Sequence, residues 1–241
     1  MRRVSEMGKM GGSRHLKRLA APGYYPVAKR ERVWVVKPSP GPHAIDEGIP
    51  LLLIVRDMLK LATTAREARK IISMKKILVD GKPRYDYKFQ VGLMDVISIP
   101  EIGVNYRMVP DPHRFLRLIE IPQSESRMKL VKVIGKRTVR GGKIQLTSHD
   151  GRNFLLDGRD VKPGDSLLIE LPSQSLIDHL KFDIGSSVLV TKGRMAGRIG
   201  RVEGIGTIIE MRDLENPELS YRGVKENLIV VGKEKPLLKL R

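Results

Sequence analysis

The stretch TKGRMAGRIGRV, residues 191–202, decides how the C-terminal part of this chain folds. Its three glycines among three arginines are typical of loops that cradle phosphates. A dinucleotide fingerprint needs G-x-G-x-x-G opening a helix, and a Walker loop ends in G-K-[ST]. Here the spacing is G-x-x-x-G-x-x-G, and RVEGIGTIIEM follows with β-branched residues and no helical stripe. The stretch therefore predicts a β-turn-β hairpin in which Gly197 and Gly200 permit positive φ or close backbone approach.

Short strands are expected on both sides of this hairpin. Within residues 107–177, Asp150-Gly151 predicts a hairpin inside KIQLTSHDGRNFLL, and Pro163-Gly164 predicts a turn into a buried strand. Residues 178–232 form a second β unit, followed by the basic tail KEKPLLKLR at 233–241. Strands at this spacing favour two small β-barrel-like domains.

The segment before residue 107 has helical periodicity. Apolar residues at positions 51, 54, 55, 58 and 62 make one stripe, which predicts a helix over 50–62 with Arg56 and Lys60 on its other side. Thr64 with Glu67 forms a capping box and predicts a second helix over 65–74. On that helix, one set of basic side chains faces outward together: Arg66, Arg69 and Lys70.

Strand signals follow these helices. The apolar run ILV precedes Asp80-Gly81, a dipeptide typical of hairpins, and a last short strand is expected over 95–99. Together the elements predict an α+β N-terminal module over residues 44–106.

The N-terminal residues 1–43 predict an extended basic arm. KPSPGPH at 37–43 has three prolines in seven residues and excludes a helix or a central strand. The segment offers little apolar surface to bury, so we expect it to be mobile until it binds RNA. Its rings Tyr24, Tyr25 and Trp34 would offer stacking faces to bases.

Composition narrows the class of protein. The 241 residues include 45 Lys and Arg against 27 Asp and Glu, a formal charge of +18, which indicates a polyanionic partner such as nucleic acid. The chain has no cysteine, its five histidines are scattered, and no apolar run reaches eighteen residues, so we expect no disulfide, no metal site, no cofactor and no membrane span. The N-terminus lacks a secretory signal, and its glycines and prolines argue against a transit peptide, so a cytoplasmic location is expected.

No catalytic constellation stands out. The carboxylates are spread singly beside basic residues, as on a salt-bridged surface, and a hairpin turn explains Asp150 beside His149 better than a dyad does.

At this point the motifs resemble known modules. Residues 48–99, with R-x-x-L-x-L-A, T-x-x-E-A-R and I-L-V-D-G-K, resemble the S4 RNA-binding module. GSSVLVTKGRMAGRIGRVEGI at 185–205 resembles a KOW motif, although Ala196 occupies a position where that motif often carries Lys. With RHLKRLAAP (14–22) and WVVKPSPGPH (34–43) ahead of them, the modules resemble the archaeal and eukaryotic-type "four-e" family of small-subunit ribosomal proteins, whose usual start corresponds to Met7.

The resemblance implies a structural, non-enzymatic ribosomal protein that binds ribosomal RNA and neighbouring ribosomal proteins, with no membrane or small-molecule partner. Two alternatives stay open: a KOW-type transcription or translation factor, and an RNA-modifying enzyme with an accessory S4 module, for which residues 107–175 offer no buried nucleophilic aspartate. The predicted RNA contacts lie in the arm, the module and the glycine loop: Arg14, His15, Lys17, Arg18, Lys29, Arg30, Arg32, Trp34, Arg56, Lys60, Arg66, Arg69, Lys70, Lys75, Lys76, Lys82, Lys192, Arg194, Arg198 and Arg201.

Overall fold

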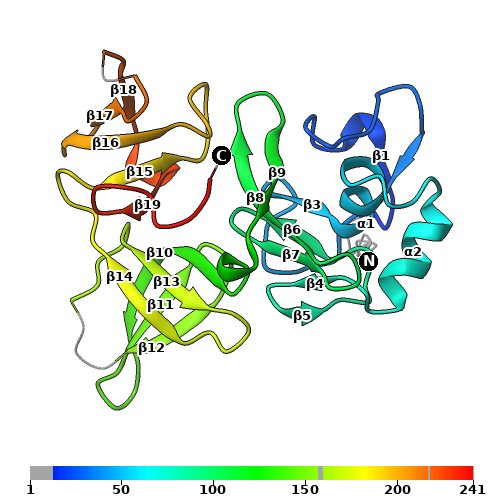
Figure 1. The fold of residues 1–241 in the computed structure, drawn as a ribbon, viewed down its shortest axis with the longest axis horizontal. Helices are drawn as coiled ribbons and strands as arrows, with labels where there is room; N and C mark the ends of the chain where they lie inside the picture. The colour runs from blue at the N-terminus through cyan, green and yellow to red at the C-terminus, as the bar shows by residue number, and fades with distance from the viewer. Residues whose placement is uncertain (1–12, 157–159, 217, 241) are drawn as a thin grey trace, which may run out of the picture.

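The protein is mostly β, with few and short helices arranged around several small sheets (Figure 1). The computed structural model describes residues 13–156, 160–216 and 218–240. The first twelve residues of the expected arm, including Met1 and Met7, lie outside the described residues.

The described part of the arm packs against the rest of the protein. β1 (Leu16–Lys17) pairs antiparallel with β2 (Trp34–Val35), and a short 3-10 helix (Arg18–Ala20) follows β1. Tyr25 and Val27 are buried in one apolar cluster with the helices of the next module. The expectation that this segment buries little apolar surface is therefore wrong for its middle, because a few well-placed rings and aliphatic groups suffice to fix a chain that has no periodicity of its own.

The first helix is shorter than its stripe predicted. α1 (Leu51–Leu53) continues into a π-helical turn (Ile54–Met58), in which the Leu59 N–H donates to the Ile54 carbonyl at 2.8 Å. Lys60 then takes a φ of 54°, which ends the helix four residues before the expected Thr64 restart. A π-helical turn contains one more residue than an α-helical turn. Side chains in and after it therefore point in other directions than those expected for a regular α-helix.

The second helix follows the prediction. α2 (Ala65–Ser73) begins at Thr64, whose hydroxyl accepts from the Glu67 N–H at 3.2 Å while the Glu67 carboxylate accepts from the Thr64 N–H at 3.3 Å. Both halves of the capping box are thus formed. Ala68 and Ile72 are buried, as the apolar face required.

The strands of this module continue beyond the expected boundary. β3 (Gly48–Pro50) pairs with β6 (Gln90–Gly92), and the larger sheet has the order β5-β4-β7-β8-β9, formed by β4 (Leu78–Val79), β5 (Lys82–Pro83), β7 (Val96–Ile99), β8 (Val104–Asp111) and β9 (Phe115–Ile121). The Asp80-Gly81 turn between β4 and β5 has two positive φ angles, as a two-residue hairpin requires. The boundary placed at 106/107 falls inside β8, because β8 and β9 extend the first sheet.

The central residues form a five-stranded antiparallel sheet of order β12-β11-β10-β13-β14. Its members are β10 (Met128–Thr138), β11 (Ile144–Ser148), β12 (Asn153–Leu156), β13 (Ser166–Glu170) and β14 (Leu176–Leu180), preceded by a 3-10 helix (Gln123–Glu125). The Asp150-Gly151 hairpin and the Gly164 turn into β13 both occur where they were predicted.

The C-terminal sheet has the order β18-β17-β16-β15-β19. It contains β15 (Ser187–Val190), β16 (Ile199–Gly204), β17 (Ile209–Asp213), β18 (Ser220–Gly223) and β19 (Leu228–Gly232), with a 3-10 helix (Lys225–Asn227) before β19. The predicted basic tail is packed rather than free, since Leu238 and Leu240 are buried in the same cluster as β15 and β19.

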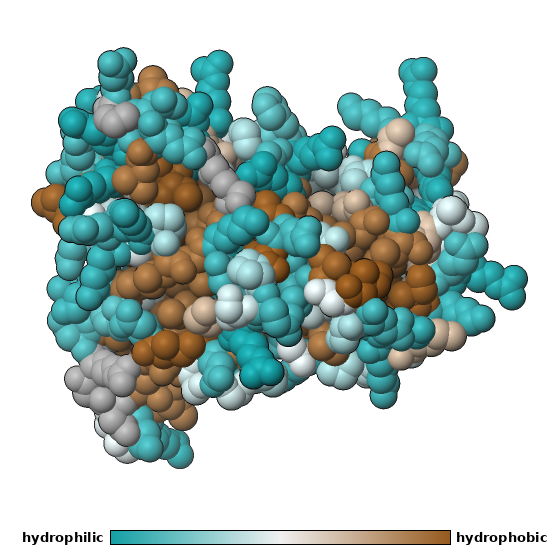
Figure 2. Space-filling view, viewed as in Figure 1, coloured by the Kyte–Doolittle hydropathy of each residue, from teal (hydrophilic) through white to brown (hydrophobic). Residues whose placement is uncertain are grey.

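Three apolar clusters hold the sheets together, and each joins segments from more than one sheet. Leu130 and Leu168 of the central sheet share one cluster with Val188 of the C-terminal sheet, and Val96 of the first module packs with Val131. Hydrophilic side chains rim the face shown in Figure 2, and hydrophobic ones form patches on either side of a central hydrophilic band. Within the described ranges, no helix is both long and apolar enough to cross a membrane.

Candidate nucleic-acid interface

The basic trio of α2, Arg66, Arg69 and Lys70, lies on the exposed face of the helix, opposite the buried Ala68 and Ile72. The Arg69 guanidinium also stacks over the Tyr87 ring, with its carbon 4.5 Å from the ring centroid. The trio is thus exposed as predicted, and one member is held by an aromatic neighbour.

A cleft between the arm and α2 brings together residues that are far apart in the sequence. It has a volume of about 330 Å³. The arm contributes Trp34, and α2 contributes Arg69. The basic residues that line it are Arg14, Arg32, Lys37, Arg56, Arg69 and Lys88. Four of these six were predicted as RNA contacts, although not as neighbours; Lys37 and Lys88 were not predicted.

Two predicted arginines are buried rather than exposed. The Arg18 Nε donates to the Val27 carbonyl at 2.7 Å, which fixes the fold of the arm. Arg56 was expected on the outer side of its helix, but the π-helical turn rotates it inward, where it pairs with Asp57 at 2.8 Å. Its side chain is only 7% exposed, at the wall of the cleft.

Two of the three rings expected to stack on bases are also unavailable. Tyr25 is buried, and the hydroxyls of Tyr24 and Tyr25 both donate to the Ile45 carbonyl, at 3.1 and 3.4 Å. Burial raises the pKa of both phenols. Trp34 alone of the three keeps an exposed ring.

The glycine loop is a turn between β15 and β16, as predicted. Gly197 has a φ of +81°, and a Cβ there would lie 2.6 Å from the Pro110 carbonyl oxygen of β8. A Cβ at Gly200 would lie 2.5 Å from the Tyr221 hydroxyl. The two glycines therefore allow close approach, one to the first module and one within the C-terminal sheet.

The basic side chains of this loop differ in whether an acidic residue of the protein already pairs with them. Lys192 pairs with Glu47 of the first module at 2.7 Å, and Arg198 pairs with Asp213 at 3.1 Å. Arg201 is exposed and donates from Nε to the Gly185 carbonyl at 3.2 Å. Arg194 is exposed at the tip, and Figure 1 shows this sheet at the far end of the molecule from α2.

The remaining predicted cations lie on the surface. Lys76 is half-buried and pairs with Glu101 at 3.0 Å. The exposed ones are His15, Lys17, Lys29, Arg30, Lys60, Lys75 and Lys82.

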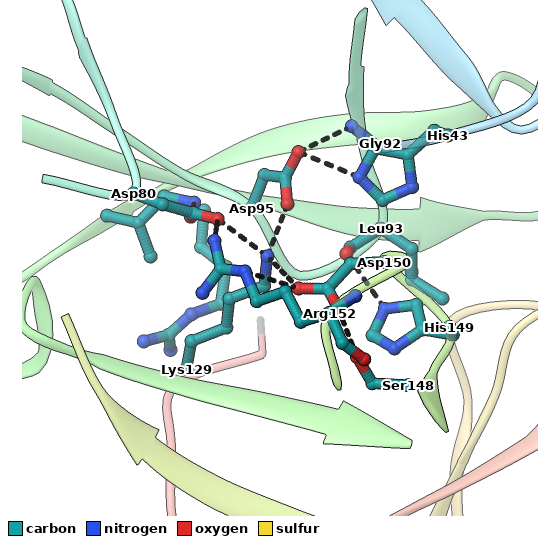
Figure 3. A network of polar contacts seen from close by, with 12 residues as sticks. His43, Asp80, Gly92, Leu93, Asp95, Lys129, Ser148, His149, Asp150 and Arg152 are labelled. Carbon is teal, nitrogen blue, oxygen red and sulfur yellow. Dashed lines mark hydrogen bonds and ion pairs between the residues drawn. The ribbon is translucent and has the colours of Figure 1, made fainter. Parts of the chain in front are cut away.

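A buried ionic network that was not predicted from the sequence joins the first module to the central sheet (Figure 3). The Lys129 ammonium of β10 is fully buried and lies 2.5 Å from Asp95, 2.7 Å from Asp80 and 3.0 Å from Asp150. Arg152 pairs with Asp80 and Asp150, and His43 of the arm lies 3.0 Å from Asp95. The three aspartates had been expected on a salt-bridged surface or in plain turns.

The charges of this network set the protonation of its members. Burial alone would raise the pKa of Asp95, but Lys129 and His43 bring it well below its usual range. Burial would lower the pKa of His43, and Asp95 more than offsets this and raises it. The network is therefore a matched set of positive and negative groups. Among the described residues, no group of three or more carboxylate or imidazole ligands could hold a metal ion.

His149 next to this network stays neutral. Its Nδ1 accepts from the Lys132 N–H at 3.1 Å, and its Nε2 lies 3.2 Å from the Leu93 carbonyl, to which it donates. Burial lowers the pKa of His149 to about 4, and Lys129 and His43 add to this against the attraction of Asp150. The neutral His149 ring thus connects β10 to the first module through its two hydrogen bonds.

Arg107 connects three segments in the same way. This fully buried arginine of β8 pairs with Glu125 at 2.8 Å and donates to the carbonyls of Met128 and Lys239, both at 3.1 Å. The predicted tail is thus anchored through its backbone. The sequence does contain a sign of this contact: Arg107 is a single charged residue followed by the apolar residues Met108 and Val109, and an arginine in a buried strand needs partners for its charge.

Comparison with known proteins agrees with this arrangement. The chain matches the model described as "Ribosomal family S4e" over residues 102–176, the RS4NT domain model over 10–46 and the S4 domain model over 51–97. It is 95% identical over 235 residues to the small ribosomal subunit protein eS4 of Korarchaeum cryptofilum, covering 98% of this chain and 100% of that protein. It is 46% identical over 246 residues to the same-named protein of Ignicoccus hospitalis, covering 95% and 96%.

A solved structure is similar as well. The 30S ribosomal protein S4e of Thermoplasma acidophilum is 32% identical, with a TM-score of 0.68 over 78% of this chain and 96% of that one. The fold similarity thus covers most of both chains. The chain belongs to the S4e family of ribosomal proteins.

Proposed function

We propose that this chain is a structural constituent of the small ribosomal subunit and not an enzyme. The observation that carries the proposal is the 95% identity, over nearly the whole chain, to a protein named small ribosomal subunit protein eS4. The formal charge of +18 supports a polyanionic partner. The ribosome is accordingly its site of action, with ribosomal RNA and neighbouring ribosomal proteins as partners.

Three basic surfaces would bind the RNA. The S4 module offers the trio of α2, the arm offers its exposed cations, and the C-terminal sheet offers Arg194 and Arg201. The match of the S4 domain to 51–97 supports a module over 44–106, to which β8 and β9 add strands. We take the central sheet as a second domain and the C-terminal sheet as a small barrel-like KOW unit. The described parts of the arm and the tail pack against these units.

The buried aspartates do not favour the RNA-modifying enzyme. Asp150 is buried in the central segment, where no such residue was expected. It is held by Lys129 and Arg152, so its negative charge is matched inside the protein. An acid–base or nucleophilic group needs access to a substrate, whereas these carboxylates serve as internal contacts.

Sedimentation tests the proposal against a transient factor. Small subunits from cells that express the tagged full chain are washed in high salt and separated on a sucrose gradient. A structural constituent stays with the subunit in amounts equal to other core proteins, whereas a translation factor or an enzyme moves to the top fractions. Recovery of the chain only in the top fractions would refute the structural role.

A further inference from the structure

We propose that the cleft between the arm and α2 binds an unstacked nucleotide of single-stranded RNA, with its base against Trp34. This inference rests on the proposed function and deepens it, because it names the kind of RNA that one site takes. The observation behind it is a cleft, lined by cations and one exposed indole, that two separate parts of the chain build together.

The shape and the ring fit a base. The cleft volume of about 330 Å³ is within the range of small-ligand sites, and Trp34 lines it with a side chain that is 55% exposed. A base offers a flat π-face of a size that matches the exposed indole. The ring is also held in place, since His15 lies 5.3 Å from it and β2 is paired with β1.

The charge fits a phosphate backbone. Of the residues that line the cleft in the described part of the chain, six are Lys or Arg and none is acidic. Two of them have outside acidic partners: Arg32 lies 3.5 Å from Glu31, and Arg56 pairs with Asp57. Arg14 and Lys88 form no ion pair with any described residue, so they remain available for phosphates. The larger groove on the other side of the arm, by contrast, includes Asp57 among its lining.

The combination favours single-stranded over duplex RNA. Bases in an A-form duplex are stacked on each other, and their faces cannot reach a side chain in a cleft. A bulge, loop or single strand can extend one base onto an aromatic ring, while its flanking phosphates meet the cations of the walls. Arg66 and Lys70, the two members of the α2 trio that do not line the cleft, offer charge without an aromatic face and so have no such selectivity.

Fluorescence gives a direct test, since Trp34 is the only tryptophan of the chain. The full-length protein is titrated with an oligoadenylate of about eight nucleotides and, separately, with an RNA duplex of the same length. We expect the single strand to quench the indole emission to saturation, and the duplex to bind, as followed by the anisotropy of a dye on the RNA, without quenching.

Substitutions measure the contribution of the ring. Trp34→Leu should weaken binding of the single strand roughly 5- to 150-fold, the loss expected for one stacked base, and leave duplex binding unchanged. Trp34→Phe should restore most of the affinity, because it retains a stacking face. Tyr85→Leu is the matched control, since Tyr85 is 70% exposed but does not line the cleft, and it should change neither affinity.

Three results would overturn the inference. Equal losses for single strand and duplex in Trp34→Leu would make the ring a general contact, and an absence of quenching would exclude stacking. A fluorescence change with oligoglutamate but not with oligoadenylate would assign the cleft to an acidic protein segment. In each case wild-type chain that still sediments with the small subunit would leave the proposed function intact, whereas loss of sedimentation would refute that function itself.

Discussion

Lys129→Met should destabilise the protein more than any single change on its surface. The substitution keeps the length of the side chain and removes the ammonium that lies between Asp80, Asp95 and Asp150. Asp80 and Asp95 belong to the first module, whereas Lys129 and Asp150 belong to the central sheet. The change therefore leaves three buried carboxylates, with Arg152 and His43 as their remaining positive partners.

The magnitude follows from the distances. At about 3 Å and an effective dielectric constant of about 20, each pair attracts by roughly 5 kcal/mol, before desolvation of the ammonium and repulsion among the carboxylates are subtracted. Removal of one partner of a buried pair costs about 3–5 kcal/mol in measured cases. We expect a loss in this range, a large fraction of the roughly 5–15 kcal/mol that stabilises a typical domain.

Urea denaturation followed by circular dichroism measures the loss. The matched control is Lys76→Met, which removes a partly exposed ion pair to Glu101 at 3.0 Å and should cost about 1 kcal/mol or less. If Lys129→Met proves too unstable to purify, Lys129→Arg keeps the charge and should unfold between the two. Equal midpoints for Lys129→Met and Lys76→Met would refute the view that this network holds the modules together.

Three further changes test other parts of the structure. Gly197→Ala should lower the free energy of unfolding by about 1–3 kcal/mol, as measured by thermal melts, and by more than Gly193→Ala does. Both glycines have a positive φ, but only at position 197 would the added Cβ lie close to a backbone oxygen, at 2.6 Å. Equal losses would contradict the contact with β8. Changing the α2 trio to Gln should leave melting unchanged and flatten the log–log salt dependence of RNA affinity by up to about 0.7–0.9 per lost phosphate contact, and an unaltered slope would mean that the trio is only solvated. Because the pKa of His149 falls from 6.5 to about 4 on folding, stability should decrease as the pH drops through that window, by at most about 3 kcal/mol; urea titrations of His149→Gln should show a smaller decrease than the wild type over the same range.

Local signals in the sequence predicted the elements that local chemistry controls. The Thr64–Glu67 capping box, the Asp80-Gly81 and Asp150-Gly151 turns and the glycine-rich hairpin all occur where they were expected. In each case the deciding hydrogen bonds or φ angles belong to residues within a few positions of each other. The exposure of the α2 trio was predictable for the same reason, since a capped helix with one apolar face fixes its opposite face.

Contacts between distant segments were not predictable in this way. The π-helical turn that rotates Arg56 inward has no sequence signature in the apolar stripe, which fits an α-helix equally well. In the sequence, Asp80 and Asp150 look like turn residues and Asp95 like the first residue of a short strand. Only the tertiary fold brings the three around Lys129. The described parts of the arm and the tail have little periodicity. They are held by buried rings, a backbone clamp at Arg107 and a few leucines, none of which can be inferred without the surface against which they pack.

The pattern of buried charge explains how so basic a chain keeps a defined shape. Among the described residues, five aspartates and five lysines or arginines are buried, so the interior carries no net formal charge apart from His43. The excess positive charge of the described residues therefore lies outside the buried interior, where cations repel each other in the free protein and attract a polyanion. Internal pairs such as those of Lys129 and Arg107 bridge sheets that would otherwise be joined by small apolar contacts alone. Orientation of the modules and attraction to RNA thus depend on separate sets of charges, and surface cations can be changed without loss of the geometry that presents them.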